Sequence, residues 1–528
     1  MSMIRRGCKL AAILVAAVLA SQAAAQELKI GLSTEPSSLD PQYHNLNPNN
    51  QLANHIFDTL VAQDPDQNLI PGLAVSWRPV GPESWEFKLR PNVKFHDGSP
   101  FTADDVVFTV ERASKVPNSP SPFTIITRQI EKVDIIDPLT IVMKTRGPAP
   151  LLPNDLGNLY IMSRKASSGE APEGKTTAQL NAGQGLAGTG PFKFVEWQRG
   201  AQLVLERNDG YWGEKPQWQK VIFRPLTNSA ARVAALLSED VDVIENPPTA
   251  DMVRLEKDPK VAVVKKQSNR VIYIAFDQFA EPTPGVPDAG GKNPFKDRRV
   301  RKALSMAIDR PAIVERVMEG QAAAAGELLP WPMFGTRENV AIEKYDPEAA
   351  KKLLAEAGYG GGFSVSLGTP NGRYVNDLKI AQTIAALWTR IGVKTEVDQA
   401  SPPVFFKNRD EFKYSAYLAG WGAGTGEMSS PLRALVATPD RGKGLGTTNK
   451  GRYSNPDMDA KLVEALATVD DARRKALLQE ASRLVMEDYG ILPLHFELAS
   501  WAVKRGLTYA GRADQLTLAQ FVKVTPTR

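Results

Sequence analysis

The secondary-structure pattern of this 528-residue chain changes near residue 290, and this change limits the fold more than any single motif. Before that point, alternating stretches such as Ser84–Leu89 and Thr140–Lys144 predict short β-strands between segments rich in Pro, Gly and Ser. Beyond it, Asp297 is expected to cap a helix whose apolar residues recur with a 3.6-residue period. Ile380–Ile391 predicts another helix, which leads into a strand at Val393–Val397. Helices alternating with strands predict an α/β layer, so we expect a β-rich lobe followed by an α/β lobe.

The first 25 residues have the three parts of a secretory signal peptide. Three basic residues precede the apolar run Leu10–Ala20, and the small residues Ala23–Ala25 form a cleavage site before Gln26. The apolar run is too short to cross a hydrocarbon core of ~30 Å. We therefore expect a cleaved signal and an exported, periplasmic protein that meets the membrane only through a partner.

The composition excludes several classes of function. Removal of the signal takes away Cys8, the only cysteine, and lowers the net charge from +5 to +2. Disulfides and thiolate metal sites are thereby excluded, and no run of like charges supports nucleic-acid binding. The four histidines lack the spacing of a zinc site, and His495 is expected to be a satisfied core or cleft-wall residue. We expect no metal and no cofactor.

Residues 188–212 predict a β-hairpin between a Gly-Pro turn and an Asn-Asp-Gly turn. The glycines at 183, 185 and 188 match the spacing of a dinucleotide-binding loop, but a strand follows them where that loop requires a helix. A GxSxG elbow and a Walker A loop are also absent from the sequence. We therefore expect a protein that is not an enzyme, with a secreted hydrolase as the alternative outside binding proteins.

Blocks along the whole mature chain resemble, in order, those of one family. The family is the extracytoplasmic solute-binding proteins of peptide-type ABC importers, family 5, which includes binders of dipeptides, oligopeptides, opines and nickel. The blocks are residues 31–41 (GLSTEPSSLDP), 68–77, 87–112, 188–212, 273–277, 294–320, 345–359 and 491–496.

The resemblance implies a two-lobed periplasmic-binding-protein fold of class II, α/β, with the ligand in a cleft between the lobes. Lobe I would comprise residues 26–270 plus 492–528, with an extra subdomain at about 50–185, and lobe II residues 271–491. The strands at Tyr273–Phe276 and Pro493–Phe496 would then be the crossovers that form the hinge. Lobe closure around a ligand is a hinge transition.

The resemblance also implies where a ligand would bind. In peptide-binding relatives a cleft Asp follows a Gly-Trp pair by two intervening residues and pairs with the ligand's α-amino group. Here the motif runs Gly420-Trp421-Gly422-Ala423-Gly424, so glycine stands where the acid is expected. Either Glu427 or Glu35 supplies the missing charge, or the ligand has no free amino group there. Trp421, Gly422 and Ala423 are predicted to contact the ligand, and the hairpin at 188–212 is not.

Other candidate residues come from loops that line the cleft in relatives. Arg373 suits a bidentate grip on a ligand carboxylate, although a solvated surface position is an equal alternative for an arginine in a loop. The remaining ligand-binding candidates are Ser33, Glu35, Asn246, Tyr374, Glu427 and Tyr453.

The function implied is that of the solute-binding subunit of an ABC importer, which binds a peptide-like or opine-like solute, closes and delivers it to the permease. The alternative within the family is an ordinary di- or oligopeptide binder that uses Glu427 or Glu35 for the ligand amino group. We expect a monomer whose partners are the ligand and the permease subunits.

Overall fold

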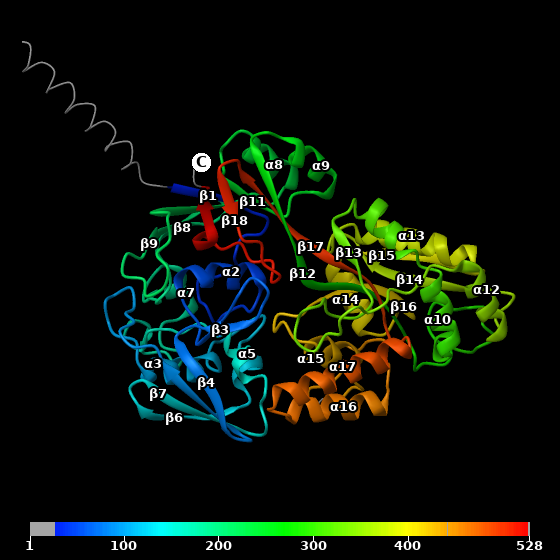
Figure 1. Cartoon of the computed structure of the whole chain (residues 1–528), viewed down its shortest axis with the longest axis horizontal. Coiled ribbons are helices and arrows are strands. Elements are labelled where there is room, and N and C mark those ends of the chain that lie inside the picture. Colours follow the sequence, from blue (N-terminus) through cyan, green and yellow to red (C-terminus); the bar gives the residue numbers. More distant parts are fainter. Residues whose placement is uncertain (1–26, 441, 526–528) are drawn as a thin grey trace, which may run out of the picture.

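A computed structural model describes residues 27–440 and 442–525; the predicted signal peptide lies outside these residues. One mixed sheet runs through the whole molecule in the order β15-β14-β16-β12-β17-β11-β1-β10-β9-β8, with β13 also paired to β17 (Figure 1). Its strands are β1 (Glu27–Leu32), β8 (Phe192–Gln198), β9 (Gln202–Arg207), β10 (Lys220–Pro225), β11 (Val243–Glu245), β12 (Val261–Phe276), β13 (Ala322–Ala324), β14 (Phe363–Pro370), β15 (Val393–Ala400), β16 (Ala416–Gly422) and β17 (Leu492–Lys504).

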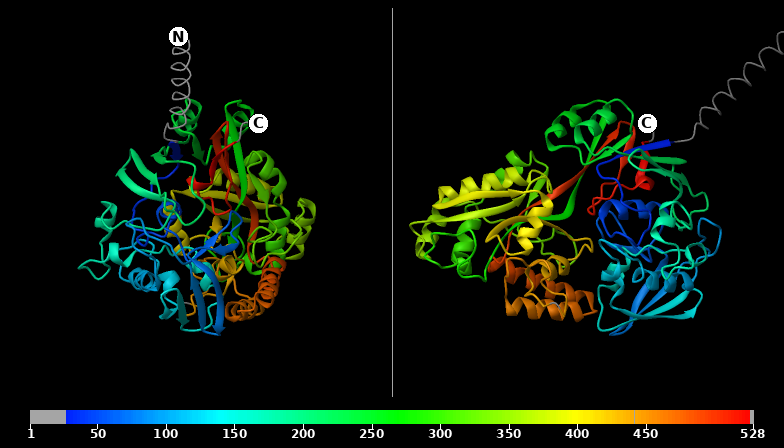
Figure 2. Two further views of the ribbon diagram at one scale, coloured as in Figure 1. Left: turned by 60° about the vertical axis from the view of Figure 1, so that its left-hand side comes forward. Right: turned by 180° about the vertical axis from the view of Figure 1, so that it is seen from behind.

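Two long antiparallel strands, β12 and β17, connect the two ends of this sheet (Figure 2). Val261–Gln267 pair with Leu498–Lys504, and the register then slips between Gln267 and Val271. After this irregularity β12 gains β16 as its second neighbour. A slipped register leaves local backbone groups outside the ladder and bends the strand, so the ladder is interrupted where the two lobes meet.

The buried apolar side chains form separate cores on the two sides of this crossing. We call the elements packed around Ile30, Phe87 and Phe223 the first lobe, and those packed around Phe276, Trp388 and Leu432 the second lobe. Along β17 the side chains change core between Phe496 and Ala499.

The first lobe contains a four-stranded antiparallel sheet of its own, in the order β4-β5-β7-β6. Thr102, with Asp105, forms a capping box at the start of α3 and satisfies backbone groups that the first helical turn leaves free. The remaining elements of the lobe are short. They are β2 (Val61–Gln63), β3 (Leu69–Pro71), β4 (Ala74–Gly81), β5 (Ser84–Leu89), β6 (Ile130–Asp137), β7 (Thr140–Thr145), β18 (Leu507–Tyr509), β19 (Val522–Val524), α2 (Asn47–Ile56), α3 (Ala103–Ala113), α4 (Thr124–Thr127), α5 (Leu152–Leu156), α6 (Arg164–Ser167), α7 (Thr177–Asn181), α8 (Ser229–Leu237), α9 (Thr249–Lys257) and η4 (Ala519–Phe521).

The second lobe is an α/β layer with a helical subdomain beside it. β14 and β15 are parallel and joined by α13, and Asp297 caps α10 by accepting a hydrogen bond from the Arg299 amide at 2.8 Å. The helices of this lobe are α10 (Arg298–Met306), α11 (Arg310–Ala312), α12 (Pro347–Glu356), α13 (Asp377–Arg390), α14 (Pro402–Asp410), α15 (Ser429–Pro431), α16 (Pro456–Ala467), α17 (Asp471–Glu487), η1 (Pro294–Lys296), and the π-helical turns η2 (Ile313–Val317) and η3 (Leu432–Val436). Among the helices of residues 27–440 and 442–525, none is both long and apolar enough to cross a membrane.

Candidate functional site

A cavity of about 770 Å³ lies where the two lobes meet. Its first-lobe wall comes from α2, the β2–β3 region, α5 and the C-terminal segment 512–521, and its second-lobe wall from residues 421–425. Asn269 and Arg270, at the register slip of β12, close it on the side of the crossing strands. This volume lies within the usual range for small-molecule sites.

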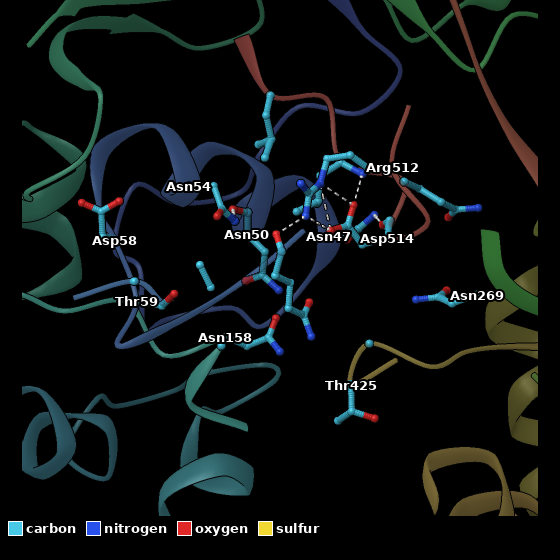
Figure 3. Close-up of a pocket in the computed structure, with 18 of the residues that line it drawn as sticks. Asn47, Asn50, Asn54, Asp58, Thr59, Asn158, Asn269, Thr425, Arg512 and Asp514 are labelled. Carbon is cyan, nitrogen blue, oxygen red and sulfur yellow. Dashed lines mark hydrogen bonds and ion pairs between the residues drawn. The ribbon is translucent and has the colours of Figure 1, made fainter. Parts of the chain in front are cut away.

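Side-chain amides dominate the polar lining of this cavity. Asn50 and Asn54 project from α2, with Asn158 on the same side and Asn269 and Thr425 across from them (Figure 3). Four buried polar atoms of the lining have no hydrogen-bond partner in the described chain: Asn50 Oδ1, Gln63 Nε2, Thr425 Oγ1 and Gln520 Oε1. Buried polar atoms are normally paired, so these atoms mark places where a solute or water completes the hydrogen bonding.

Three of the cavity's carboxylates are already engaged. Asp514 receives the Arg512 guanidinium at 2.6 Å, and Glu214 receives the Lys523 ammonium at 2.6 Å. Asp58 accepts hydrogen bonds from Thr189 Oγ1 (2.8 Å), Tyr211 Oη (3.2 Å) and Trp212 Nε1 (2.8 Å). Burial nevertheless raises the pKa of Asp58, and these three donors only oppose that shift.

The fourth carboxylate, Asp155 on α5, has a pKa raised to about 7. Burial is the main cause, opposed mainly by the nearby positive charge of Arg433. Its Oδ2 accepts a hydrogen bond from Gln129 Nε2 at 2.9 Å. Because burial favours the uncharged form of Asp155, this side chain is a poor anchor for a permanent cation.

Two arginines of the lining come from the region of the crossing strands. Arg270 Nε lies 3.4 Å from the buried Glu497 carboxylate, and Arg373 adds a positive field at the same carboxylate. Arg373 is exposed and forms no ion pair with the described residues; its guanidinium lies 5.1 Å from the ring centroid of Tyr374. The hinge side of the cavity therefore carries one uncompensated positive charge.

The segment 421–425 enters the cavity from the end of β16. Trp421 lies half-buried on the lining, and its Nε1 donates to Ser430 Oγ at 3.1 Å. Gly424 is exposed on the lining, and a Cβ atom built on it would meet no atom within 4 Å. The carbonyl of Gly424 accepts a hydrogen bond from Gln67 Nε2 of the first lobe at 3.0 Å. Of the residues predicted from the sequence, Arg373, Trp421 and Gly422 lie on the cavity.

Glu427 differs from the prediction, because its carboxylate is turned into the second lobe. It is 1% exposed and forms an ion pair with Arg474 of α17. Burial raises the pKa of Glu427, and the charge of Arg474 opposes this shift. Leu432 and Met428, on the same stretch of chain, are buried in the core of this lobe. This packing holds Glu427 against α17 and outside the cavity lining, although its negative charge still helps to raise the pKa of Asp155.

Glu35 also lies away from the cavity. Its Oε1 accepts hydrogen bonds from Trp197 Nε1 at 3.0 Å and from the Gly200 amide at 2.9 Å, which joins β1 to the β8–β9 hairpin. Ser33 donates from its amide and its hydroxyl to Glu245, each at 2.7 Å, and Asn246 Nδ2 donates to Ser33 Oγ at 3.1 Å. These groups form a network at the ends of β1 and β11 outside the cavity lining.

The last three predicted residues are buried in the second lobe. Tyr374 donates from its hydroxyl to the Gly420 carbonyl at 3.2 Å, and Ala423 accepts a hydrogen bond from Asn269 Nδ2 at 3.0 Å. Tyr453 is 2% exposed and contacts Asn455. Tyr374 and Ala423 thus support neighbours of the lining, whereas Tyr453 packs in the core.

The C-terminal wall of the cavity was not predicted from the sequence. No sequence motif marks residues 512–521. The asparagines of α2 are the sequence feature that could have indicated an amide-rich lining. The hairpin region also differs from the expectation, because Tyr211 and Trp212 lie on the cavity lining through their hydrogen bonds to Asp58. Within residues 27–440 and 442–525 there is no cluster of three or more His, Cys, Asp or Glu that could hold a metal.

Comparisons with known proteins agree with this architecture. Residues 68–443 match the bacterial extracellular solute-binding proteins, family 5 (middle). The chain is 29% identical to the glutathione-binding protein GsiB of Pectobacterium atrosepticum, over 92% of this chain and 91% of that protein. It is 28% identical to heme-binding protein A of Haemophilus influenzae, over 80% of this chain and 78% of that protein.

A solved structure of a binding protein also has this fold. The chain superimposes on the unliganded open form of MppA, a periplasmic murein tripeptide-binding protein, with a TM-score of 0.79 and 26% identity, covering 95% of this chain and 98% of that one. The two lobes, the crossing strands and the cavity between them are those of a periplasmic binding protein. The chain belongs to the bacterial extracellular solute-binding proteins of family 5, and its function is to bind a solute.

Proposed function

We propose that this protein is the periplasmic, non-catalytic subunit of an ABC importer, and that it carries an amino-blocked, peptide-like or opine-like organic acid. Export would use the predicted cleavable signal at residues 1–25, and delivery would be to a membrane permease by a monomer. Lobe I would be residues 26–270 plus 492–528 with a subdomain at about 50–185, and lobe II residues 271–491.

The observation that carries the ligand class is the charge balance of the cavity. Arg373 is a cation without an ion-pair partner in the described chain, whereas Asp514, Glu214 and Asp58 are engaged and Asp155 titrates near neutral pH. An ammonium group enclosed without a counter-charge is costly, and a carboxylate facing an unpaired guanidinium is favourable. The cavity therefore favours a solute with an acidic group and without a free amine.

The alternative within the family, an ordinary peptide binder that uses Glu427 or Glu35, has less support. Both carboxylates lie outside the cavity lining and are committed to other partners. Gly424 leaves open space where the family pattern has an acid. The relatives named for glutathione and murein tripeptide support a peptide-like solute.

Matched probes test this proposal by thermal shift and calorimetry. We expect binding in the order N-acetyl-Ala-Ala above Ala-Ala, and loss of binding when the carboxylate of N-acetyl-Ala-Ala is converted to an amide. Arg373→Gln should abolish the preference for the free carboxylate. Arg390→Gln, at the far end of α13 from Arg373, is the matched control and should keep it. Equal binding of the acid and the amide, or tighter binding of Ala-Ala, would contradict the proposal.

A further inference from the structure

Two arginines from opposite lobes meet beside the cavity, at its α5 end. Arg128 follows α4 in the first lobe, and Arg433 lies on the π-helical turn η3 of the second lobe. The Nη2 atoms of Arg433 and Arg128 lie 3.0 and 3.1 Å from the position that a Cβ atom on Gly444 would occupy. The two guanidinium groups therefore approach each other closely across the junction between the lobes.

Neither of these two arginines forms an ion pair with a described residue. No carboxylate of residues 27–440 and 442–525 lies within 4.0 Å of either guanidinium. Arg433 is half-buried and donates from Nε to the Gly444 carbonyl at 3.1 Å, whereas Arg128 is exposed. Burial, and then the charge of Arg128, lower the pKa of Arg433, which Asp155 opposes from a distance. Like charges held this close repel unless an anion lies between them.

We propose that Arg128 and Arg433 form an oxyanion-binding site that bridges the two lobes. A carboxylate or phosphate can accept hydrogen bonds from both guanidinium groups at once, and the planar donors of arginine suit such bidentate contacts. The anion would bind most tightly when the lobes are together, because only then do both arginines reach it. Because the anion would bind the closed protein more tightly than the open protein, its binding would favour closure.

The bound group can come from two sources. One is a free inorganic oxyanion in the periplasm, and the other is an acidic group of the transported solute, since Asp155 lies both on the cavity lining and within the electrostatic reach of the two arginines. The second source rests on the proposed function, whereas the first does not. A phosphate titration without any peptide therefore tests the site even if the ligand class is wrong.

The test compares the melting temperature of the mature protein with and without 10 mM inorganic phosphate, at constant ionic strength, in wild type and variants. If phosphate binds with a Kd of about 1 mM, we expect a rise of roughly 2 °C in wild type. Arg128→Gln should abolish it, and this variant leaves the fold intact because the Arg128 side chain makes no hydrogen bond with the described residues. Lys443→Gln removes a charge from the neighbouring loop and should retain the wild-type shift.

Charge reversal separates binding from a general salt effect. Arg128→Glu should pair with Arg433, raise the melting temperature without phosphate and cancel the phosphate increment. For the second source, the affinities of N-acetyl-Asp-Ala and N-acetyl-Asn-Ala are compared in wild type and Arg128→Glu. If wild type prefers the aspartyl probe and the variant does not, the site binds an acidic group of the solute. The proposal would be overturned if phosphate raised the melting temperature equally in wild type and both Arg128 variants and no protein preferred the aspartyl probe.

Discussion

The carboxylate of Glu427 and the guanidinium of Arg474 form a buried ion pair. The pair links the chain just after the cavity-lining segment 421–425 to α17. Arg474 also reaches Asp471 on the first turn of α17, at 2.8 Å. Removing one partner of a buried pair leaves the other charge without compensation, whereas the pair itself contributes little net stability. Glu427 therefore packs within the second lobe, whereas its sequence position three residues after Gly424 predicts a ligand contact.

We predict that Glu427→Leu destabilises the protein without changing its ligand preference. Arg474 loses its buried partner and keeps only the exposed Asp471, so the free energy of unfolding should fall by about 3 kcal/mol. Urea denaturation measures this loss. Glu427→Leu combined with Arg474→Met is the control and should recover much of it. A single variant that retains full stability but loses peptide binding would show that Glu427 serves the ligand.

Gly424→Asp should create affinity for a free amino terminus. The new side chain meets open space on the cavity lining, and Gly424 does not have the positive φ that only glycine adopts easily. A carboxylate there would pair with a ligand ammonium, so we expect Ala-Ala to bind about tenfold more tightly, or by about 1.4 kcal/mol. Calorimetry with Ala-Ala and N-acetyl-Ala-Ala measures the difference. Gly424→Asn has the same shape without the charge, and an equal gain in that variant would rule out the electrostatic explanation.

Gln67 should hold the two lobes together. Its side chain accepts a hydrogen bond from Asn269 Nδ2 at 2.8 Å and donates to the Gly424 carbonyl at 3.0 Å. Gln67→Asn keeps a residue type that tolerates the positive φ of 65° but shortens the side chain, so both bonds are lost. We expect a larger radius of gyration by small-angle scattering and faster ligand release. An unchanged radius of gyration and release rate would show that these bonds do not restrain opening.

His495 should make the protein sensitive to acid. The side chain is fully buried, both ring nitrogens lack a hydrogen-bond partner in the described chain, and burial lowers its pKa to about 4. Between pH 6.5 and 4 the unfolded chain binds a proton there and the folded protein does not, so this contribution to stability is present above pH 6.5 and is lost as the pH falls.

The loss should reach about 2 kcal/mol at pH 5, from 1.4 kcal/mol per pH unit. His495→Leu has a similar volume and no ionisable group, so its free energy of unfolding should fall less between pH 7.5 and pH 5 than that of wild type. Urea titrations of both proteins at the two pH values measure the difference. The opposite sign is expected of Asp155, whose raised pKa favours the folded state as the pH falls from 7 toward 3.8. An identical loss in wild type and His495→Leu would contradict the assignment to His495.

Local sequence patterns determined much of the scaffold, because capping and alternation depend on neighbours in the chain. The strand at Ser84–Leu89, the cap at Asp297 and the hairpin after residue 188 all form as predicted. The family and its two-lobed fold also followed from the order of the sequence blocks. The chain after Asp309 is less regular, since it divides into a short α11 and the π-helical turn η2.

The direction of each side chain was decided only by the tertiary structure. Glu427 and Gly424 are three residues apart, yet one enters the core against Arg474 and the other faces the cavity, because packing of the chain after β16 rotates them to different sides. The C-terminal segment 512–521 reaches the cavity because β17 returns the chain to the first lobe. The sequence therefore determined what kind of protein this is, whereas long-range packing decided which of its charges can meet a solute.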